Sequence, residues 1–423
     1  MKRVFSLALT ALLLAGCTAA PADGSESSTV VTAETAAAQA STGNGEPLRL
    51  LQHGDEKQYY FRESVDNTET LLRYRIADLT QYNDYIPCDV EGCTHDSESC
   101  PAVAPYTFGY QPWVLDENTL LAMEYSFDEE RTTLFLMDRE CHNRRELTTL
   151  DNCNLFSYSD QACTDGEALY VRGEQNGRDG LYRVDLEDGN LTEVYPFSLG
   201  NFYVVGAIGR TYLVEQSQVT YPDPTGDLIA DAQAEPSGTK MQLLLNVDTG
   251  ETRELRTFSS EDGSLNAIET YVADDVCYSF DSSTGALSTL DWNTGDEHLI
   301  TDQLPLPAEY ESPVDYNIKA NLNGWLVFYN LPVIVNTETG EARQRADLPE
   351  NYWNGYGHQP DIALQLKDRL LVDCRYEPIT RTTLSTDGTP YTIEFDQMYL
   401  GLISIDDFLN GVPNYTEVCK GPY

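Results

Sequence analysis

The sequence predicts an all-β protein, and more closely a β-propeller with seven four-stranded blades, six or eight blades being the alternatives. One hairpin pattern recurs seven times: an alternating apolar run, an acidic or Asn-containing turn with Gly, and a second alternating run. Aromatic residues make up 10% of the chain, which suits strands, and no stretch keeps a helical period of apolar residues. A jelly roll or β-sandwich would also suit the composition, but neither explains a hairpin repeated in this way.

The N-terminus has the form of an export signal. Lys2 and Arg3 precede an apolar run of about a dozen residues, which is too short for a stable bilayer-spanning helix. Residues 14–17, Leu-Ala-Gly-Cys, resemble the bacterial lipobox, in which Cys17 receives a diglyceride and fatty acids such as palmitate after residues 1–16 are removed. An ordinary signal peptide or a short anchor helix is the alternative. The resemblance implies that the membrane is a partner through the lipid anchor, on the outer side of the cytoplasmic membrane at the cell surface.

Residues 17–47 comprise this cysteine and a disordered tether, because they contain no aromatic residue and few large apolar ones. The propeller domain then occupies residues 48–423. The formal charge of -43 repels phosphate backbones, so nucleic acid is not expected as a partner. Solubility outside the cell accounts for this charge, and attraction of divalent cations or a basic partner is the alternative. We expect a monomer.

The hairpin copies define the blades in chain order. Each has Gly and Asx residues in a turn between β-branched or aromatic strands, and two further short strands precede most copies. The copies begin at Leu71, Leu134, Leu181, Leu243, Leu287, Val333 and Tyr399. With these DxxTGE-type turns, residues 48–423 resemble the β-propeller superfamily that includes bacterial quinoprotein-like and lipoprotein propellers of unassigned function. The resemblance implies an architecture but no activity, because this scaffold hosts enzymes, receptors and assembly factors.

Four long segments are predicted to share one face of the ring. Residues 217–240 and 377–397 fall between the second and third strands of their blades, while 88–102 and 348–361 read as blade-to-blade connections at the same end. The last segment holds the ligand-binding candidates Tyr352, Trp353, Tyr356 and His358, whose rings could stack on a sugar or a peptide. The alternative is that these aromatic side chains pack against their own blade and the loops are only lids.

Residues 88–102 hold the metal or disulfide candidates Cys88, Cys93, His95 and Cys100. Their spacing, C-x4-C-x-H-x4-C, matches no common zinc finger, although Gly92 could let the loop wrap one Zn ion. A disulfide with one spare thiol is favoured by an extracytoplasmic location, and reduced thiols are the third alternative. The motif also resembles a Cys-x-His-x4-Cys-Pro element of uncharacterised propeller lipoproteins from anaerobic Gram-positive bacteria, which implies a structural feature without an assigned activity.

The other cysteines divide into two groups. Once Cys17 is lipidated, nine cysteines remain, so at least one has no thiol partner within a monomer. Cys277 and Cys374 lie in apolar strands and should behave as small buried hydrophobic residues. A local disulfide is plausible among Cys141, Cys153 and Cys163.

Common catalytic motifs are missing from the sequence. There is no GxSxG, no phosphate-binding GxxxxGK[ST] and no HExxH, and we name no catalytic residue; His358 is the one histidine to test as a base. The 69 acidic residues make carboxylate pairs unavoidable and therefore uninformative. We predict a binding or scaffold module for a carbohydrate, peptide or envelope protein. The alternatives are an extracytoplasmic hydrolase or lyase acting on polysaccharide and a structural subunit of a transport or secretion assembly.

Overall fold

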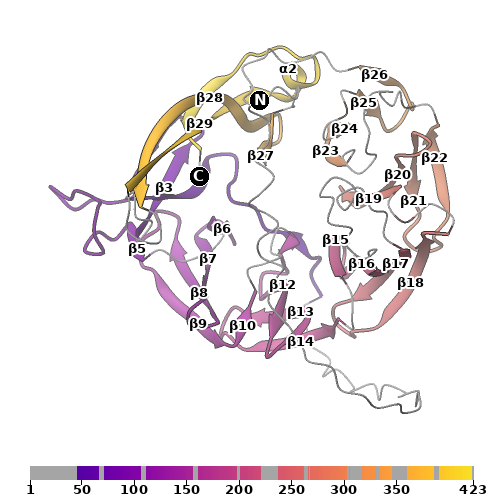
Figure 1. Ribbon diagram of the computed structural model, residues 1–423, viewed down its shortest axis with the longest axis horizontal. Coiled ribbons are helices and arrows are strands. Elements are labelled where there is room, and N and C mark those ends of the chain that lie inside the picture. Colours follow the sequence, from indigo (N-terminus) through magenta and orange to yellow (C-terminus); the bar gives the residue numbers. More distant parts are fainter. Residues whose placement is uncertain are drawn as a thin grey trace. The chain divides into compact units, whose positions relative to one another are not determined.

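The structure is a computed structural model, and its central feature is a set of seven antiparallel sheets that follow one another around a ring in the unit spanning residues 38–423 (Figure 1). This confirms the predicted seven-bladed β-propeller. The structure describes residues 45–65, 71–105, 111–155, 161–197, 201–220, 237–261, 265, 267–302, 304, 317–328, 331, 333–344, 360–384 and 390–421. Cys17 and the rest of residues 1–44, which include the predicted leader and most of the predicted tether, lie outside these residues.

Each blade is built from one continuous stretch of chain, and β1 is added to the third. Blade one contains β2 (Gln58–Ser64), β3 (Leu71–Asp78), β4 (Asn83–Tyr85) and β5 (Val103–Pro105); blade two contains β6 (Trp113–Val114), β7 (Thr119–Ser126), β8 (Arg131–Asp138) and β9 (Arg145–Asp151). Blade three contains β10 (Cys153–Asn154), β11 (Cys163–Thr164), β12 (Ala168–Gln175), β13 (Arg178–Asp185) and β14 (Leu191–Pro196), with β1 (Arg49–Leu50) paired to β11.

The remaining blades follow the same order from the inner to the outer strand. Blade four contains β15 (Asn201–Ile208), β16 (Thr211–Thr220), β17 (Ser237–Asn246) and β18 (Thr252–Ser259); blade five contains β19 (Ile268–Ala273), β20 (Val276–Asp281), β21 (Ala286–Leu290) and β22 (Glu297–Thr301). Blade six contains β23 (Ile318–Leu322), β24 (Trp325–Phe328), β25 (Val333–Asn336) and β26 (Ala342–Gln344); blade seven contains β27 (Ile362–Gln365), β28 (Arg369–Leu384), β29 (Pro390–Ser404), the short helix α2 (Ile405–Leu409) and β30 (Thr416–Lys420). No helix among the described residues is long and apolar enough to cross a membrane.

All seven predicted hairpins form the outer strands of the blades. One kind of turn recurs in them, with an Asp or Asn side chain that accepts a backbone N–H and a glycine with positive φ. In the turn after β13, Oδ1 of Asp185 accepts the backbone N–H of Glu187 at 2.9 Å, and Gly189 has φ +75°. The turn after β17 repeats this arrangement, with the side chain of Asn246 as acceptor and Gly250 at φ +68°. Glycine reaches this left-handed conformation without the steric cost of a Cβ, so the Asx and Gly positions of the repeat have a direct structural role.

The hydrophobic core lies between neighbouring blades. Strands alternate buried and half-buried positions, as in β3 and β8, so that each sheet packs one set of side chains against either neighbour. Between blades five and six, for example, the rings of Phe280 and Phe328 meet edge to face with centroids 5.0 Å apart. Burying one such side chain stabilises the fold by about 1.5–3 kcal/mol.

The ring closes by packing, because the described strands of blade seven all come from the C-terminal part of the chain. Tyr59 and Phe61 of blade one share an apolar cluster with Leu371 and Leu402 of blade seven. The N-terminal segment adds a second tie: Leu48 donates its N–H to the carbonyl of Gly209 in blade four, and the chain then pairs with β11 and reaches blade one. The carbonyl of Gln52 also accepts the N–H of Val114 in blade two, so residues 46–54 join blades four, three, two and one.

Candidate functional site

The loop with three cysteines and one histidine lies at the outer edge of blade one. β4 pairs with the end of β3 and β5 with its beginning, so residues 86–102 interrupt the outer strand of this blade. Figure 1 shows this segment projecting outward beside β5. The prediction that the segment connects two blades is therefore wrong. A strand can leave its ladder and rejoin it further along, and the spacing of the hairpins does not reveal such a break.

Four side chains of this loop, Cys88, Cys93, His95 and Cys100, come together and are called the Cys–His cluster below. One ligand atom from each lies within 4.8 Å of the other three, and Nδ1 of His95 is 3.3 Å from Sγ of Cys100. The backbone N–H of His95 donates to Sγ of Cys93 and lowers the pKa of that thiol. Burial raises the pKa of Cys100 to about 12. The sequence prediction that these four residues form one group is consistent with this geometry.

No disulfide joins the nine cysteines from Cys88 to Cys419, all of which lie in the described part of the chain. The local bridge expected among Cys141, Cys153 and Cys163 is therefore not found, because the three side chains pack into three different apolar clusters. The disulfide alternative for the Cys–His cluster is likewise not found in this structure. Cys277 is buried as expected, and Cys374 is half-buried.

The ends of the ring differ in the length of their loops. Because each blade runs in chain order through antiparallel strands, all loops between second and third strands emerge at one end, here called the loop face, and the short turns emerge at the other, the turn face. On the loop face β28 and β29 are 16 and 15 residues long, and β16 and β17 are 10 residues each. The described parts of the predicted insertions 217–240 and 377–397 lengthen the second and third strands of their blades, at the expected place, and residues 221–236 and 385–389 lie outside the described part of the chain.

The longer hairpin has a braced base. The guanidinium of Arg375 stacks 3.5 Å from the ring centroid of Tyr399 and donates to Glu417 at 2.9 Å. The hydroxyl of Tyr399 donates to Glu377 at 2.7 Å. Beyond this base, Thr380 on β28 is exposed. The outer parts of β28 and β29 therefore form an exposed two-stranded ribbon, and these side-chain contacts stabilise its base. The aromatic candidates Tyr352, Trp353, Tyr356 and His358 lie outside the described residues.

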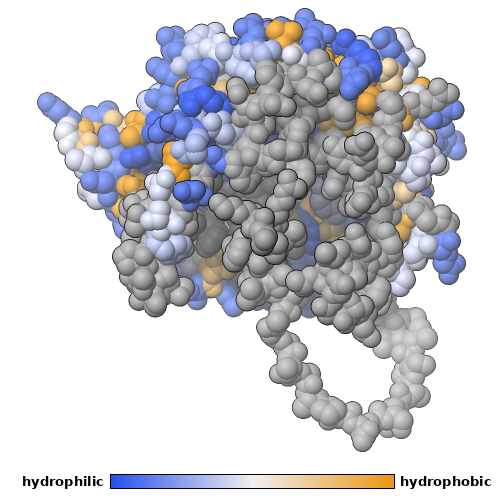
Figure 2. Space-filling view, turned by 45° about the horizontal axis from the view of Figure 1, so that its top comes forward, coloured by the Kyte–Doolittle hydropathy of each residue, from blue (hydrophilic) through white to orange (hydrophobic). Residues whose placement is uncertain are grey.

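Hydrophilic residues dominate the described surface in Figure 2, and hydrophobic residues are confined to small separate groups. The exposed large hydrophobic side chains are correspondingly scattered over the chain, from Leu50 to Val412. This distribution agrees with the high negative charge of the sequence.

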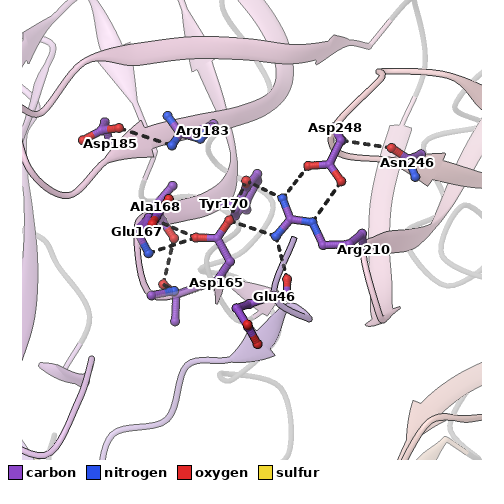
Figure 3. A network of polar contacts seen from close by, with 12 residues as sticks. Glu46, Asp165, Glu167, Ala168, Tyr170, Arg183, Asp185, Arg210, Asn246 and Asp248 are labelled. Carbon is purple, nitrogen blue, oxygen red and sulfur yellow. Dashed lines mark hydrogen bonds and ion pairs between the residues drawn. The ribbon is translucent and has the colours of Figure 1, made fainter. Parts of the chain in front are cut away.

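A network on the turn face holds the N-terminal segment (Figure 3). Arg210, in the turn between β15 and β16, donates to Asp248 at 3.0 and 2.5 Å and to Oδ2 of Asp165 at 2.9 Å. It also donates to the carbonyl of Glu46 at 2.7 Å and to the hydroxyl of Tyr170 at 3.1 Å. Burial alone would raise the pKa of Asp165, but the hydrogen bonds from Arg210 and from backbone N–H groups lower it. This network joins blades three and four.

The charge of one carboxyl group acts on another between blades four and five. Burial, and then the charge of Glu215, raise the pKa of Glu269 to about 7, while Lys240 acts in the opposite direction. Nζ of Lys240 lies 3.6 Å from Glu215 and donates to the carbonyl of Ile268 at 3.0 Å. Glu269 is the second residue of the inner strand β19, which begins at the loop face. Sequence analysis missed this pair, because nothing in the spacing of the two residues relates them.

Comparison with known proteins finds no matching family and no matching curated protein. Among solved structures, puromycin hydrolase has a TM-score of 0.42 and 12% identity over 86% of this chain, which corresponds to 59% of that protein. The β-propeller domain of the Trilobed protease from Pyrococcus furiosus, described as having an open velcro topology, has a TM-score of 0.43 and 11% identity over 86% of this chain and 98% of that one. An oligogalacturonate lyase from Vibrio parahaemolyticus has a TM-score of 0.41 and 12% identity over 82% of this chain and 90% of that one. The chain is a seven-bladed β-propeller by its own seven sheets, and these likenesses carry no argument about its activity.

Proposed function

We propose that this protein is a lipid-anchored extracytoplasmic propeller that serves as a binding or scaffold module. Its loop face would bind a carbohydrate, a peptide or a neighbouring envelope protein. The observation that carries the proposal is the extended hairpin of β28 and β29, whose strands of 16 and 15 residues reach beyond the sheet on a braced base. Loops on a rigid scaffold are the usual carriers of binding residues.

The path of the N-terminal segment supports an orientation for this module. Glu46 is bound by Arg210 at the turn face, so an anchored chain would reach the ring at the end opposite the loop face. A flexible tether of the length between Cys17 and Glu46 has a root-mean-square extension of roughly 30 Å, so the loop face would remain accessible from outside.

The anchor is tested with Cys17→Ala in cells fed a palmitate analogue. We expect the unchanged protein to carry the label and to sediment with membranes, and the variant to lose both properties. A labelled or membrane-bound variant would contradict the anchor.

The binding face is tested by photocrosslinking in whole cells. A photoreactive residue at Thr380 on the loop face is compared with one at Thr249, an exposed threonine in a hairpin turn on the turn face. We expect crosslinks to envelope protein or glycan from Thr380 and few from Thr249. Equal crosslinking from both positions, or crosslinking from Thr249 alone, would contradict the assignment of the face.

The pair of Glu215 and Glu269 favours one second candidate, a hydrolase or lyase acting on polysaccharide. A carboxyl with a pKa of about 7 can act as a general acid at neutral pH, and glycoside cleavage uses a second carboxyl, a role that Glu215 would fill. The test is the release of reducing ends or unsaturated products from acidic and neutral polysaccharides. Activity that is lost in Glu269→Gln would favour the enzyme, and no activity on any of them would leave the binding module as the proposal.

A further inference from the structure

The Cys–His cluster has the size of a zinc site. Around a tetrahedral zinc ion, bond lengths of about 2.3 Å to sulfur and 2.0 Å to nitrogen place neighbouring ligand atoms about 3.5–3.8 Å apart. In this loop the four ligand atoms all lie within 4.8 Å of one another, and the nitrogen and sulfur of His95 and Cys100 are 3.3 Å apart. We propose that the Cys–His cluster binds one zinc ion as a closed structural site.

The backbone of the loop contacts two of the sulfur ligands. The N–H of His95 points at Sγ of Cys93, and the N–H of Ala102 points at Sγ of Cys100. In each case the N–H two residues further along donates to the sulfur. A donor at this position fixes the orientation of the sulfur, and such outer contacts orient metal ligands.

The backbone conformation of the loop also supports a metal site. His95 has φ +56° and Gly92 φ +74°, so the chain makes two left-handed turns within four residues. A left-handed conformation costs a non-glycine residue roughly 1–2 kcal/mol, and such conformations cluster at ligand clamps. Arg73 holds the turn from blade one, donating from Nη1 to the carbonyl of His95 at 3.3 Å.

The loop has little else to stabilise it. Residues 86–102 contain no strand or helix, and their buried residues are Pro87, Cys100 and Ala102, beside Val103 of β5, whereas Val90 is 53% exposed. A loop of this length with so small an apolar cluster needs a further cross-link, and the described cysteines form no disulfide. One ion with four ligands would supply that cross-link.

The ligand types favour zinc as the metal, and their number indicates a structural site. Three sulfurs and an imidazole suit zinc, whereas calcium and magnesium need oxygen ligands. Four protein ligands leave no open position, so the ion would be structural and not catalytic. Binding displaces protons from the thiols and needs no oxidant or reductant. The site is independent of the proposed binding face, because it lies at the outer edge of blade one.

The first experiment measures metal in the full mature chain and in its soluble form from residue 24, purified without oxygen. We expect about one zinc per chain, lowered more than about tenfold in Cys93→Ser and in His95→Ala. The matched controls are Cys374→Ser and His298→Ala, which change the same residue types outside the loop and should retain zinc. Cobalt in place of zinc should give a sulfur-to-cobalt charge-transfer band and the visible bands of a tetrahedral site, both absent in Cys93→Ser.

A second experiment does not depend on the folding of a variant. Hydrogen exchange is measured on the unchanged protein with zinc, after a chelator, and after zinc is restored. We expect exchange within residues 86–102 to rise on chelation and to fall again with zinc, while the seven sheets stay protected. Four results would each overturn the proposal. The first three are a purified protein that contains no zinc, a Cys93→Ser variant that keeps its zinc, and a disulfide that forms within the cluster under anaerobic conditions. The fourth is a hydrogen exchange rate within residues 86–102 that the chelator leaves unchanged.

Discussion

Replacing Arg210 by Met should destabilise the ring and loosen the N-terminal segment at Glu46. The side chain of Asp165 is completely buried, and in the variant its carboxylate loses the guanidinium beside it. Removing one partner of a buried ion pair costs about 3–5 kcal/mol. The lower end applies here, because Asp165 keeps donors from the N–H groups of Glu167 and Ala168, at 3.0 and 2.9 Å, and from Tyr170 at 3.0 Å.

The expected change in melting temperature follows from the length of the domain. With an unfolding entropy of roughly 2.1 cal/mol/K per residue, a domain of this size has about 0.8 kcal/mol/K, so about 3 kcal/mol lowers the melting temperature by about 4 °C. Calorimetry of the soluble form measures this change. Limited proteolysis should also cut near Glu46 more readily in the variant, because the carbonyl of Glu46 loses its donor.

The control is Arg131→Met, which removes an exposed arginine paired with Glu129. Exposed ion pairs contribute about 0–1 kcal/mol, so this variant should melt within about 1 °C of the unchanged protein. If Arg210→Met melts as high as Arg131→Met, and its N-terminal segment is no more easily cut, the network of Figure 3 does not hold the ring as argued.

Two further predictions concern a carboxyl and a turn. The pKa of Glu269 is about 7 in the folded protein and 4.5 in its ordinary state, so the folded protein binds this proton more tightly than the unfolded chain. The free energy of unfolding that the proton contributes is therefore lost as pH rises from about 4.5 through about 7. Glu269→Gln should therefore match the unchanged protein near pH 4.5 and melt higher at pH 8; a difference that does not grow with pH would contradict the raised pKa. Gly340→Ala should destabilise the protein more than Gly209→Ala, because both residues have positive φ but only at Gly340 would a Cβ meet the carbonyl of Ile300. If urea denaturation gives the same loss in the free energy of unfolding for both variants, the strand that contains Ile300 shifts to make room for the Cβ, and the predicted clash is wrong.

The outer hairpins were predictable, because Asp185 with Gly189 and Asn246 with Gly250 act within a few residues of one another. The Cys–His cluster was predictable as a group for the same reason. Its place was not, because whether residues 86–102 continue a strand or leave it depends on the pairing of β5 with β3.

Local chemistry in the sequence determined the repeated turns, the alternating strands, the number of blades and the composition of the Cys–His cluster. Tertiary structure alone decided which distant residues meet: Glu46 with Arg210, Glu215 with Glu269, and blade one with blade seven. The reason is physical. A turn is stabilised by hydrogen bonds within a few residues, whereas contacts between blades depend on how the sheets are arranged around the ring, and no short stretch of sequence records that arrangement.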